Sequence, residues 1–196
     1  WPTFFQILLL GSAIVGGILF AFITAWVFGR EYSDRTVKEL LALPTPRAVI
    51  VTAKFVLSSL WIMGLALTIF VASLGVGQFM DIPGYSTELV RASFGSHMLI
   101  TFLTFMLMPL VALFASAGRG YLPPLAWAFL TMGLAQIAGV LGWADWFPWS
   151  VPGLLVSLDG APVEPLAVHS YGMVLLVFVA GMVATFAWWQ SADQAR

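Results

Sequence analysis

Five long apolar stretches alternate with short polar segments along the 196 residues of this chain. A helix that crosses about 30 Å of hydrocarbon needs roughly 20 apolar residues, because each residue of an α-helix rises about 1.5 Å. The strands of a membrane barrel alternate over only about ten residues, so these continuous stretches do not fit them. The pattern predicts an all-α, polytopic membrane protein with a single transmembrane domain over residues 1–196 and spans at about 4–28, 48–78, 92–116, 121–141 and 167–189.

Composition leads to the same fold class. Hydrophobic residues make up 61% of the chain and charged residues 9%, whereas roughly a quarter of a soluble domain is charged. The net charge is −1, so nothing indicates a nucleic-acid partner, and membrane lipid is the expected surrounding. Cysteine is absent, which excludes disulfides and thiolate chemistry.

The loops differ in their content of basic residues. One side of the predicted bundle carries seven of the eight Lys and Arg residues, and the other side carries only Arg91 together with five of the nine acidic residues. Lys and Arg concentrate on the cytoplasmic side of membrane proteins. The loop after the first span is therefore predicted to be cytoplasmic, and Trp1 to lie outside. The odd number of spans leads us to expect a further span ahead of Trp1.

The segment between the first two spans is the most strongly charged part of the chain. From Arg30 to Arg47 it contains four of the eight Lys and Arg residues. A membrane protein that concentrates its charge in one short loop is expected to use that loop to contact a soluble partner.

The same segment has the pattern of a short amphipathic helix, predicted over about residues 33–43. Ser33 is placed to cap this helix, and Pro44 is placed to end it. Charged side chains occupy most of the surface of the predicted helix. Three apolar residues share the remaining face at helical spacing: Val37, Leu40 and Leu41.

The residues of this segment resemble those of the membrane subunit of type-2 ABC (ABC-2) exporters, a family that includes antibiotic-export and lantibiotic-immunity permeases. The family pattern runs from a glutamate through a threonine and a leucine pair to a proline, an arginine and a lysine in the next span. Its counterparts here are Glu31, Thr36, Leu40, Leu41, Pro44, Arg47 and Lys54. Many members have glycine immediately before the threonine, and Arg35 at this position favours the bacitracin and lantibiotic branch. Residues 118–124 and 146–152 also resemble segments around the family's penultimate span.

The resemblance implies a permease in the cytoplasmic (inner) membrane of a prokaryote that exports a hydrophobic or amphipathic substrate, such as a peptide antibiotic, a drug or a lipid. It implies no cofactor in this chain, since ATP and Mg²⁺ would bind to a separate cytoplasmic ABC ATPase. A second membrane subunit, identical or related, would complete the pathway. By the same resemblance, residues 33–43 form the coupling helix that docks on the ATPase, and the coupling residues are Glu31, Arg35, Thr36, Val37, Lys38, Leu40, Leu41, Pro44 and Arg47.

The chemistry of the chain agrees with an external source of energy. No charged residue lies near the middle of a predicted span, and the sequence contains no phosphate-binding loop of the G-x-x-x-x-G-K-[ST] type. Some coupling residues also have a simpler interpretation. Glu31 could be an interfacial carboxylate paired with Arg30 or Arg35, and Arg47 and Lys54 could reach lipid headgroups.

Small residues in the first span permit close approach of another helix. They pair at a spacing of four, Ser12 with Gly16 and Ala13 with Gly17. Ordinary packing within the subunit is one interpretation, and a position beside a substrate pathway at a dimer interface is the other. We therefore assign Ser12, Gly16 and Gly17 to helix packing or to the pathway.

The segment 143–165 is too short to be a separate domain and is expected to form short re-entrant helices at the outer face. An integral membrane enzyme or a non-transporting scaffold is the alternative function. Asp145, Asp159 and Glu164 are too scattered for a recognisable catalytic site, so we do not expect an enzyme. His97 and His169 are expected to pack near the outer interface, without a metal.

Overall fold

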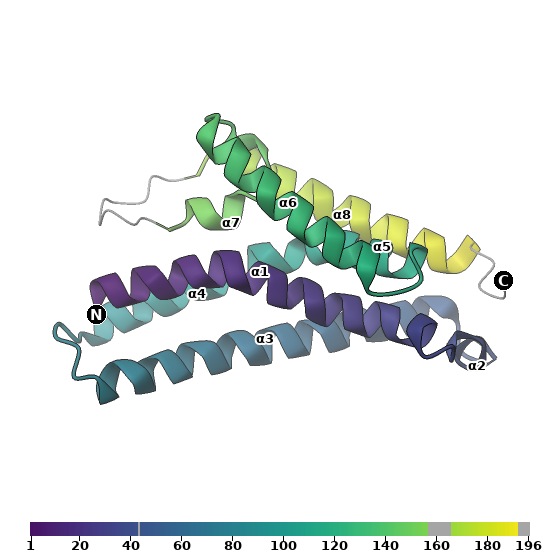
Figure 1. Cartoon of the computed structure of the whole chain (residues 1–196), viewed down its shortest axis with the longest axis horizontal. Helices are drawn as coiled ribbons and strands as arrows, with labels where there is room; N and C mark the ends of the chain where they lie inside the picture. Colours follow the sequence, from purple (N-terminus) through teal and green to yellow (C-terminus); the bar gives the residue numbers. More distant parts are fainter. Residues whose placement is uncertain (43, 157–165, 192–196) are drawn as a thin grey trace.

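A computed structural model describes residues 1–42, 44–156 and 166–191 of the chain, and every regular element in this part is helical (Figure 1). Five stretches of helix are long and apolar enough to cross a membrane. The all-α, polytopic fold predicted from the sequence is therefore confirmed. The spanning helices are α1 (Pro2–Ser33), α3 (Arg47–Phe79), α4 (Thr87–Met106) with α5 (Met108–Ala117), α6 (Leu122–Val140) and α8 (Val168–Ser191).

Three short helices lie at the ends of the bundle. The helix α2 (Val37–Leu41) follows α1 at one end, which we call the α2 end, and η1 (Ala144–Trp146) and α7 (Val151–Leu154) follow α6 at the opposite end (Figure 1). The helices η1 and α7 form part of the predicted re-entrant segment 143–165, of which residues 157–165 lie outside the described residues. With 32 residues, α1 is about 48 Å long, so it extends beyond a hydrocarbon core of about 30 Å.

The third span is broken into α4 and α5, whereas the sequence predicted one helix over 92–116. Pro109 lacks the N–H group that would bond to the carbonyl of Phe105 in a continuous helix. The N–H of Leu107 instead bonds to the carbonyl of Thr104 at 3.1 Å, which tightens the chain at the break. Twelve of the 30 residues of α4 and α5 are buried, so the break lies inside the bundle.

The helix α8 packs tightly on this broken span. A Cβ atom on Gly181 would lie 2.9 Å from the backbone nitrogen of Leu110, closer than real side chains come. The hydroxyl of Thr185 donates a hydrogen bond of 3.1 Å to the carbonyl of Pro109. The glycine and the threonine thus hold α8 against the start of α5.

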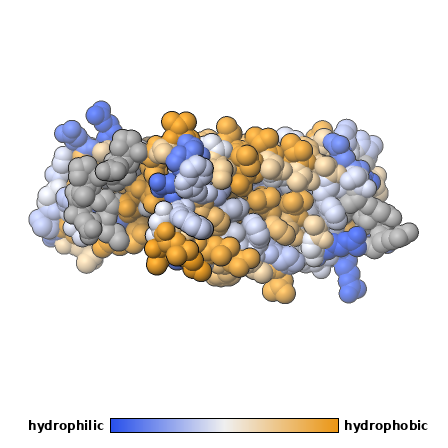
Figure 2. Space-filling model, turned by 90° about the horizontal axis from the view of Figure 1, so that it is seen from above, coloured by the Kyte–Doolittle hydropathy of each residue, from blue (hydrophilic) through white to orange (hydrophobic). Residues whose placement is uncertain are grey.

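The middle of the bundle is apolar and both of its ends are polar (Figure 2). Large apolar side chains such as Leu60, Val71, Ile137 and Leu176 are more than half exposed, which suits lipid better than water. Among the described basic residues, only Arg91 lies at the end opposite α2. The others gather at the α2 end, as the predicted orientation requires: Arg30, Arg35, Lys38, Arg47, Lys54 and Arg119.

His97 joins three helices in the interior. Its side chain is 1% exposed, its Nε2 lies 3.0 Å from the carbonyl oxygen of Ala66 on α3, and its Nδ1 lies 3.0 Å from the Oγ of Ser12 on α1. Since a carbonyl oxygen only accepts, Nε2 carries a proton. The Oγ of Ser12 is also 2.8 Å from the carbonyl oxygen of Leu8. The prediction that His97 packs at the outer interface is therefore wrong.

Replacing His97 with alanine should destabilise the protein by about 1–3 kcal/mol, because the change leaves a cavity and removes a partner from both Ser12 and Ala66. Thermal unfolding in detergent would measure the loss. His169→Ala is the control, since the ring of His169 stacks on Trp146 (4.1 Å between ring centroids) and bridges no three helices. Equal unfolding temperatures for the two variants would contradict the role given to His97.

The predicted orientation can be tested with single cysteines, because the chain has none of its own. Ser33 and Ser86 are both exposed and lie at opposite ends of the bundle. A cysteine at Ser33 should react with a membrane-impermeant maleimide only from the cytoplasmic side, and one at Ser86 only from outside. Reaction at Ser33 from outside would invert the orientation.

Candidate functional site

The charged segment after α1 forms the five-residue helix α2, shorter than the predicted 33–43. Val37 is 9% exposed, whereas Lys38 and Glu39 are exposed. Leu40 and Leu41 are half-buried and pack on a cluster of residues at the same end of the bundle: Val27, Phe28, Ile50, Val51, Phe55, Ala112, Ala115 and Trp189. The apolar face of α2 is therefore covered by the protein itself, and the charged face is the one open to a partner.

The turn into α2 does not start at Ser33, which is the last residue of α1. Arg35 has a φ of 60°, and the N–H of Thr36 bonds to the carbonyl of Glu31 at 2.9 Å. A left-handed backbone costs a residue with a side chain about 1–2 kcal/mol and costs glycine much less. This explains why glycine is common at this place in the exporters that the segment resembles. The prediction that Ser33 caps the helix is wrong, because α1 continues through this residue.

Glu31 forms an ion pair with Lys54 of α3, in which the lysine is buried and the carboxylate is partly exposed. The Nζ of Lys54 lies 2.6 Å from each carboxylate oxygen of Glu31 and also donates to the carbonyl of Val27. The side chain of Lys54 is 8% exposed and that of Glu31 is 23% exposed. The alternative that Glu31 pairs with Arg30 or Arg35 is therefore wrong. Lys54 does not extend to headgroups either.

Arg47, at the start of α3, binds the end of α8. Its Nη1 donates to the carbonyl oxygens of Trp189 (3.1 Å) and Gln190 (3.3 Å). The last carbonyls of a helix carry partial negative charge, which a guanidinium stabilises. The indole N–H of Trp189 donates in turn to the Oγ of Ser116 on α5 at 3.0 Å. Together with the pair formed by Lys54, these bonds connect α1, α3, α5 and α8 directly beneath α2.

The remaining predicted coupling residues lie on the surface beside this network. Arg35 and Pro44 are exposed, and Thr36 is half-buried. The predicted set thus divides by position. Arg35, Lys38 and Pro44 are exposed, and Arg47 binds the end of α8. The others lie in α2, in the turn before it and in the last turn of α1, and they are partly or fully buried.

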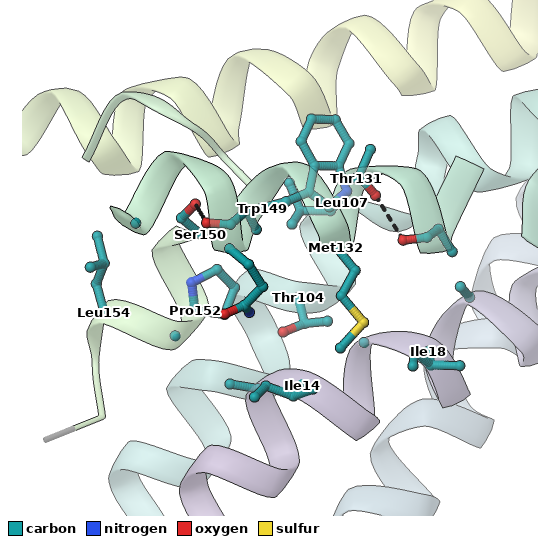
Figure 3. Close-up of a pocket in the computed structure, with 18 of the residues that line it drawn as sticks. Ile14, Ile18, Thr104, Leu107, Thr131, Met132, Trp149, Ser150, Pro152 and Leu154 are labelled. Carbon is teal, nitrogen blue, oxygen red and sulfur yellow. Dashed lines mark hydrogen bonds between the residues drawn. The ribbon is translucent and has the colours of Figure 1, made fainter. Parts of the chain in front are cut away.

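A cavity of about 240 Å³ lies between α1, α6 and the segment with η1 and α7 (Figure 3). Ile14 and Ile18 form its wall on α1, and Met132 reaches across from α6. The broken third span adds Thr104 and Leu107. Residues far apart in the sequence enclose the rest of the cavity, including Trp149, Ser150 and Pro152.

The polar side chains of this cavity are largely occupied by the backbone of the protein. The hydroxyl of Thr104 donates to the carbonyl of Ile100 (2.8 Å), and that of Thr131 donates to the carbonyl of Trp127 (2.9 Å). No charged side chain is among the described residues that line the cavity. A guest would therefore be held mainly by apolar contact, with the amide of Gln136 as a polar group on the lining.

The three small residues predicted for packing or the pathway have different positions. Gly17 lines the cavity, whereas Ser12 is bound to His97. A Cβ atom on Gly16 would meet only the ring of Phe20, at 3.9 Å. Sequence reasoning missed the part that α6 plays in this site, since no motif connects Met132 with α1. Within the described residues, no group of three or more His, Asp or Glu side chains could hold a metal ion.

Comparisons with known proteins show the family of this chain. Residues 3–135 match the ABC-2 family transporter protein family, a range that includes α2 and the α1 wall of the cavity. The chain is 27% identical over 180 residues to the bacitracin transport permease protein BCRB of Bacillus licheniformis, and the alignment covers 92% of this chain and 86% of that protein. No solved structure shows a significant match. Because the family match covers more than half of its length, the chain belongs to the ABC-2 family of transporter membrane proteins.

Proposed function

We propose that this chain is the permease subunit of an ATP-driven exporter that moves hydrophobic or amphipathic molecules across the cytoplasmic membrane of a prokaryote. The uncharged cavity between α1 and α6 is the observation that carries the choice of substrate class. One similar protein is named a bacitracin transport permease, so bacitracin is the first substrate to test. ATP and Mg²⁺ bind to a separate ATPase subunit in this proposal, and no residue of this chain is given a catalytic role.

The ATPase docks on the charged face of α2 in this proposal. Support comes from the burial of the apolar face, which leaves Lys38 and Glu39 as the exposed part of the helix. The neighbouring Arg35 and Pro44 extend the same surface. Glu31 acts indirectly, because its carboxylate is held by Lys54 and fixes the turn that precedes α2.

A second membrane subunit, identical or related, covers the cavity from the side of α6. In α6 only Pro124 and Thr131 are buried, against eleven residues in α1. A Cβ atom on Gly133 or Gly139 of α6 would meet no atom within 4 Å, which leaves room for close approach of another helix. Five spans packed about 8–10 Å apart enclose little space of their own, so the pathway is completed by the second subunit.

Reversing both charges of α2, Lys38→Glu with Glu39→Lys, should weaken ATPase binding about tenfold. The change places like charges against those of the partner without altering the buried face of α2. Co-purification with the ATPase from membranes would measure the effect. Arg91→Glu, an exposed change at the opposite end, is the control and should bind normally. Normal binding by the double variant would remove α2 from the docking surface.

Enlarging Gly17 to leucine should lower bacitracin export at least tenfold, because the added side chain fills part of the cavity. A Cβ atom on Gly17 would meet Cγ2 of Thr104 at 3.9 Å, so the first carbon fits and the rest of the side chain enters the open space. Uptake into inverted vesicles that contain the ATPase would measure export. Gly64→Leu on α3 adds the same side chain at an exposed position with no atom within 4 Å, and its export should stay near normal. If Gly17→Leu exports bacitracin as well as the parent protein, the cavity is not the substrate site.

A further inference from the structure

We propose that a backbone contact between Gly29 of α1 and Gly120 of the α5–α6 turn transmits movement of α2 to α6, and that Gly29 is a positioning residue for transport. This inference rests on the proposed function, in which α2 contacts the ATPase and α6 forms a wall of the substrate cavity. The contact between Gly29 and Gly120 adds a specific connection between α2 and α6.

The two glycines lie in unusually close contact. A Cβ atom on Gly29 would lie 3.0 Å from the carbonyl oxygen of Gly120, 3.1 Å from its carbonyl carbon and 3.3 Å from Cδ1 of Tyr121. Two of these three atoms belong to the backbone, so they cannot rotate away as the end of a side chain could. A methyl group at position 29 would press on this backbone and displace the turn from α1 by a few tenths of an ångström.

The sequence of the turn explains why the carbonyl of Gly120 has no partner in the first turn of α6. In an α-helix this carbonyl would accept from residue 124, and in a 3₁₀ turn it would accept from residue 123. Both are prolines, which have no N–H group. The carbonyl group lies side-on against Gly29, since its oxygen and its carbon are almost equally far from the position of a Cβ atom there.

The turn is firm enough to transmit a displacement. The N–H of Gly118 bonds to the carbonyl of Phe114 (2.9 Å), and that of Gly120 bonds to the carbonyl of Ala115 (3.2 Å). A Cβ atom on Gly118 would overlap with the ring of Pro123, so the end of α5 and the start of α6 are in direct contact. Movement of the turn therefore carries the first residues of α6 with it.

The same contact lies next to the connection to α2. Gly29 is four residues before Ser33, where α1 ends, and a Cβ atom on Gly120 would lie 3.9 Å from the Oγ of Ser33. The N–H of Thr36 is bonded to Glu31 in the same turn of α1. A shift of α2 thus acts on α1 within a few residues of Gly29.

The helix α6 is also the spanning helix with the fewest buried residues. Side-chain hydrogen bonds of His97, Lys54, Arg47 and Thr185 connect α1, α3, α4, α5 and α8 to one another. A hydrogen bond that reaches α6 from another element is a long one, 3.3 Å from the Oγ of Ser150 to the carbonyl of Ala135. A push at the α5–α6 turn therefore moves α6 against a connected group of helices, and the cavity between α1 and α6 changes width.

The test uses the complete complex with its ATPase in liposomes. Cysteines at Ile14 and Met132, the only ones in the chain, carry spin labels on opposite walls of the cavity. The distance between the labels should change when ATP and vanadate are added. In Gly29→Ala this change should fall to less than half, and the unlabelled variant should export about tenfold less bacitracin per ATP hydrolysed, with normal ATPase binding.

Gly120→Ala is the matched control, because it adds the same methyl group to the same turn but meets no atom closer than 3.9 Å. It should behave like the parent. A full distance change in Gly29→Ala, or an equal loss in Gly120→Ala, would overturn the inference. If Gly29→Ala does not accumulate, Tyr121→Ala removes the ring beside Gly29 without adding volume. The distance change should then also fall, and an unchanged one overturns the inference.

The two levels of the proposal fail in different ways. If the parent complex does not bind the ATPase, or shows no distance change with ATP and vanadate, the proposed function fails and this inference fails with it. If the parent shows the change and Gly29→Ala shows it equally, the proposed function stands and only the role of Gly29 is lost.

Discussion

The ion pair between buried Lys54 and partly exposed Glu31 fixes the charged loop of this protein on its apolar bundle. Removing a charge from water costs several kcal/mol, and only close contact with further hydrogen bonds offsets that cost. Lys54 makes such bonds to both carboxylate oxygens of Glu31 and to the carbonyl of Val27. The last turns of α1 are thereby held on α3, next to Gly29 and to the turn that leads into α2.

The number and type of the spanning helices could be predicted from the sequence, because the length of an apolar run is a local property. The break at Leu107 was missed because the spans were predicted from hydropathy, which does not register the missing N–H group of Pro109, although a proline within a helix is a signal for such a break. His97 was predicted to pack at the outer interface because it lies near the outer end of the predicted span 92–116. Its partners Ser12 and Ala66 are 85 and 31 residues away along the chain, so only the folded bundle shows that this ring is satisfied in the interior.

In the candidate site, too, local features could be predicted from the sequence and contacts between distant residues could not. Helical spacing was enough to place Val37, Leu40 and Leu41 on one face of α2, but spacing cannot say whether a partner or the protein itself covers that face. Ser33 has the residue type of a helix cap, yet it is the last residue of α1 and does not begin α2. Gly17 could be singled out as a small residue of the first span, and it lines the cavity. The opposite wall of the cavity could not be identified, because no sequence pattern in α6 indicates that this helix lies across from α1.

The hydroxyl groups of the cavity, already bonded to their own backbone, have a consequence for the kind of molecule that the cavity would select. A guest that gains or loses a polar substituent changes few hydrogen bonds with such walls, whereas each added methylene contributes about 0.8 kcal/mol until the space is filled. Affinity across a series of related compounds should then follow lipophilicity and size. A compound altered only in its polar substituents would still fit such a cavity, and one with a bulkier scaffold would not.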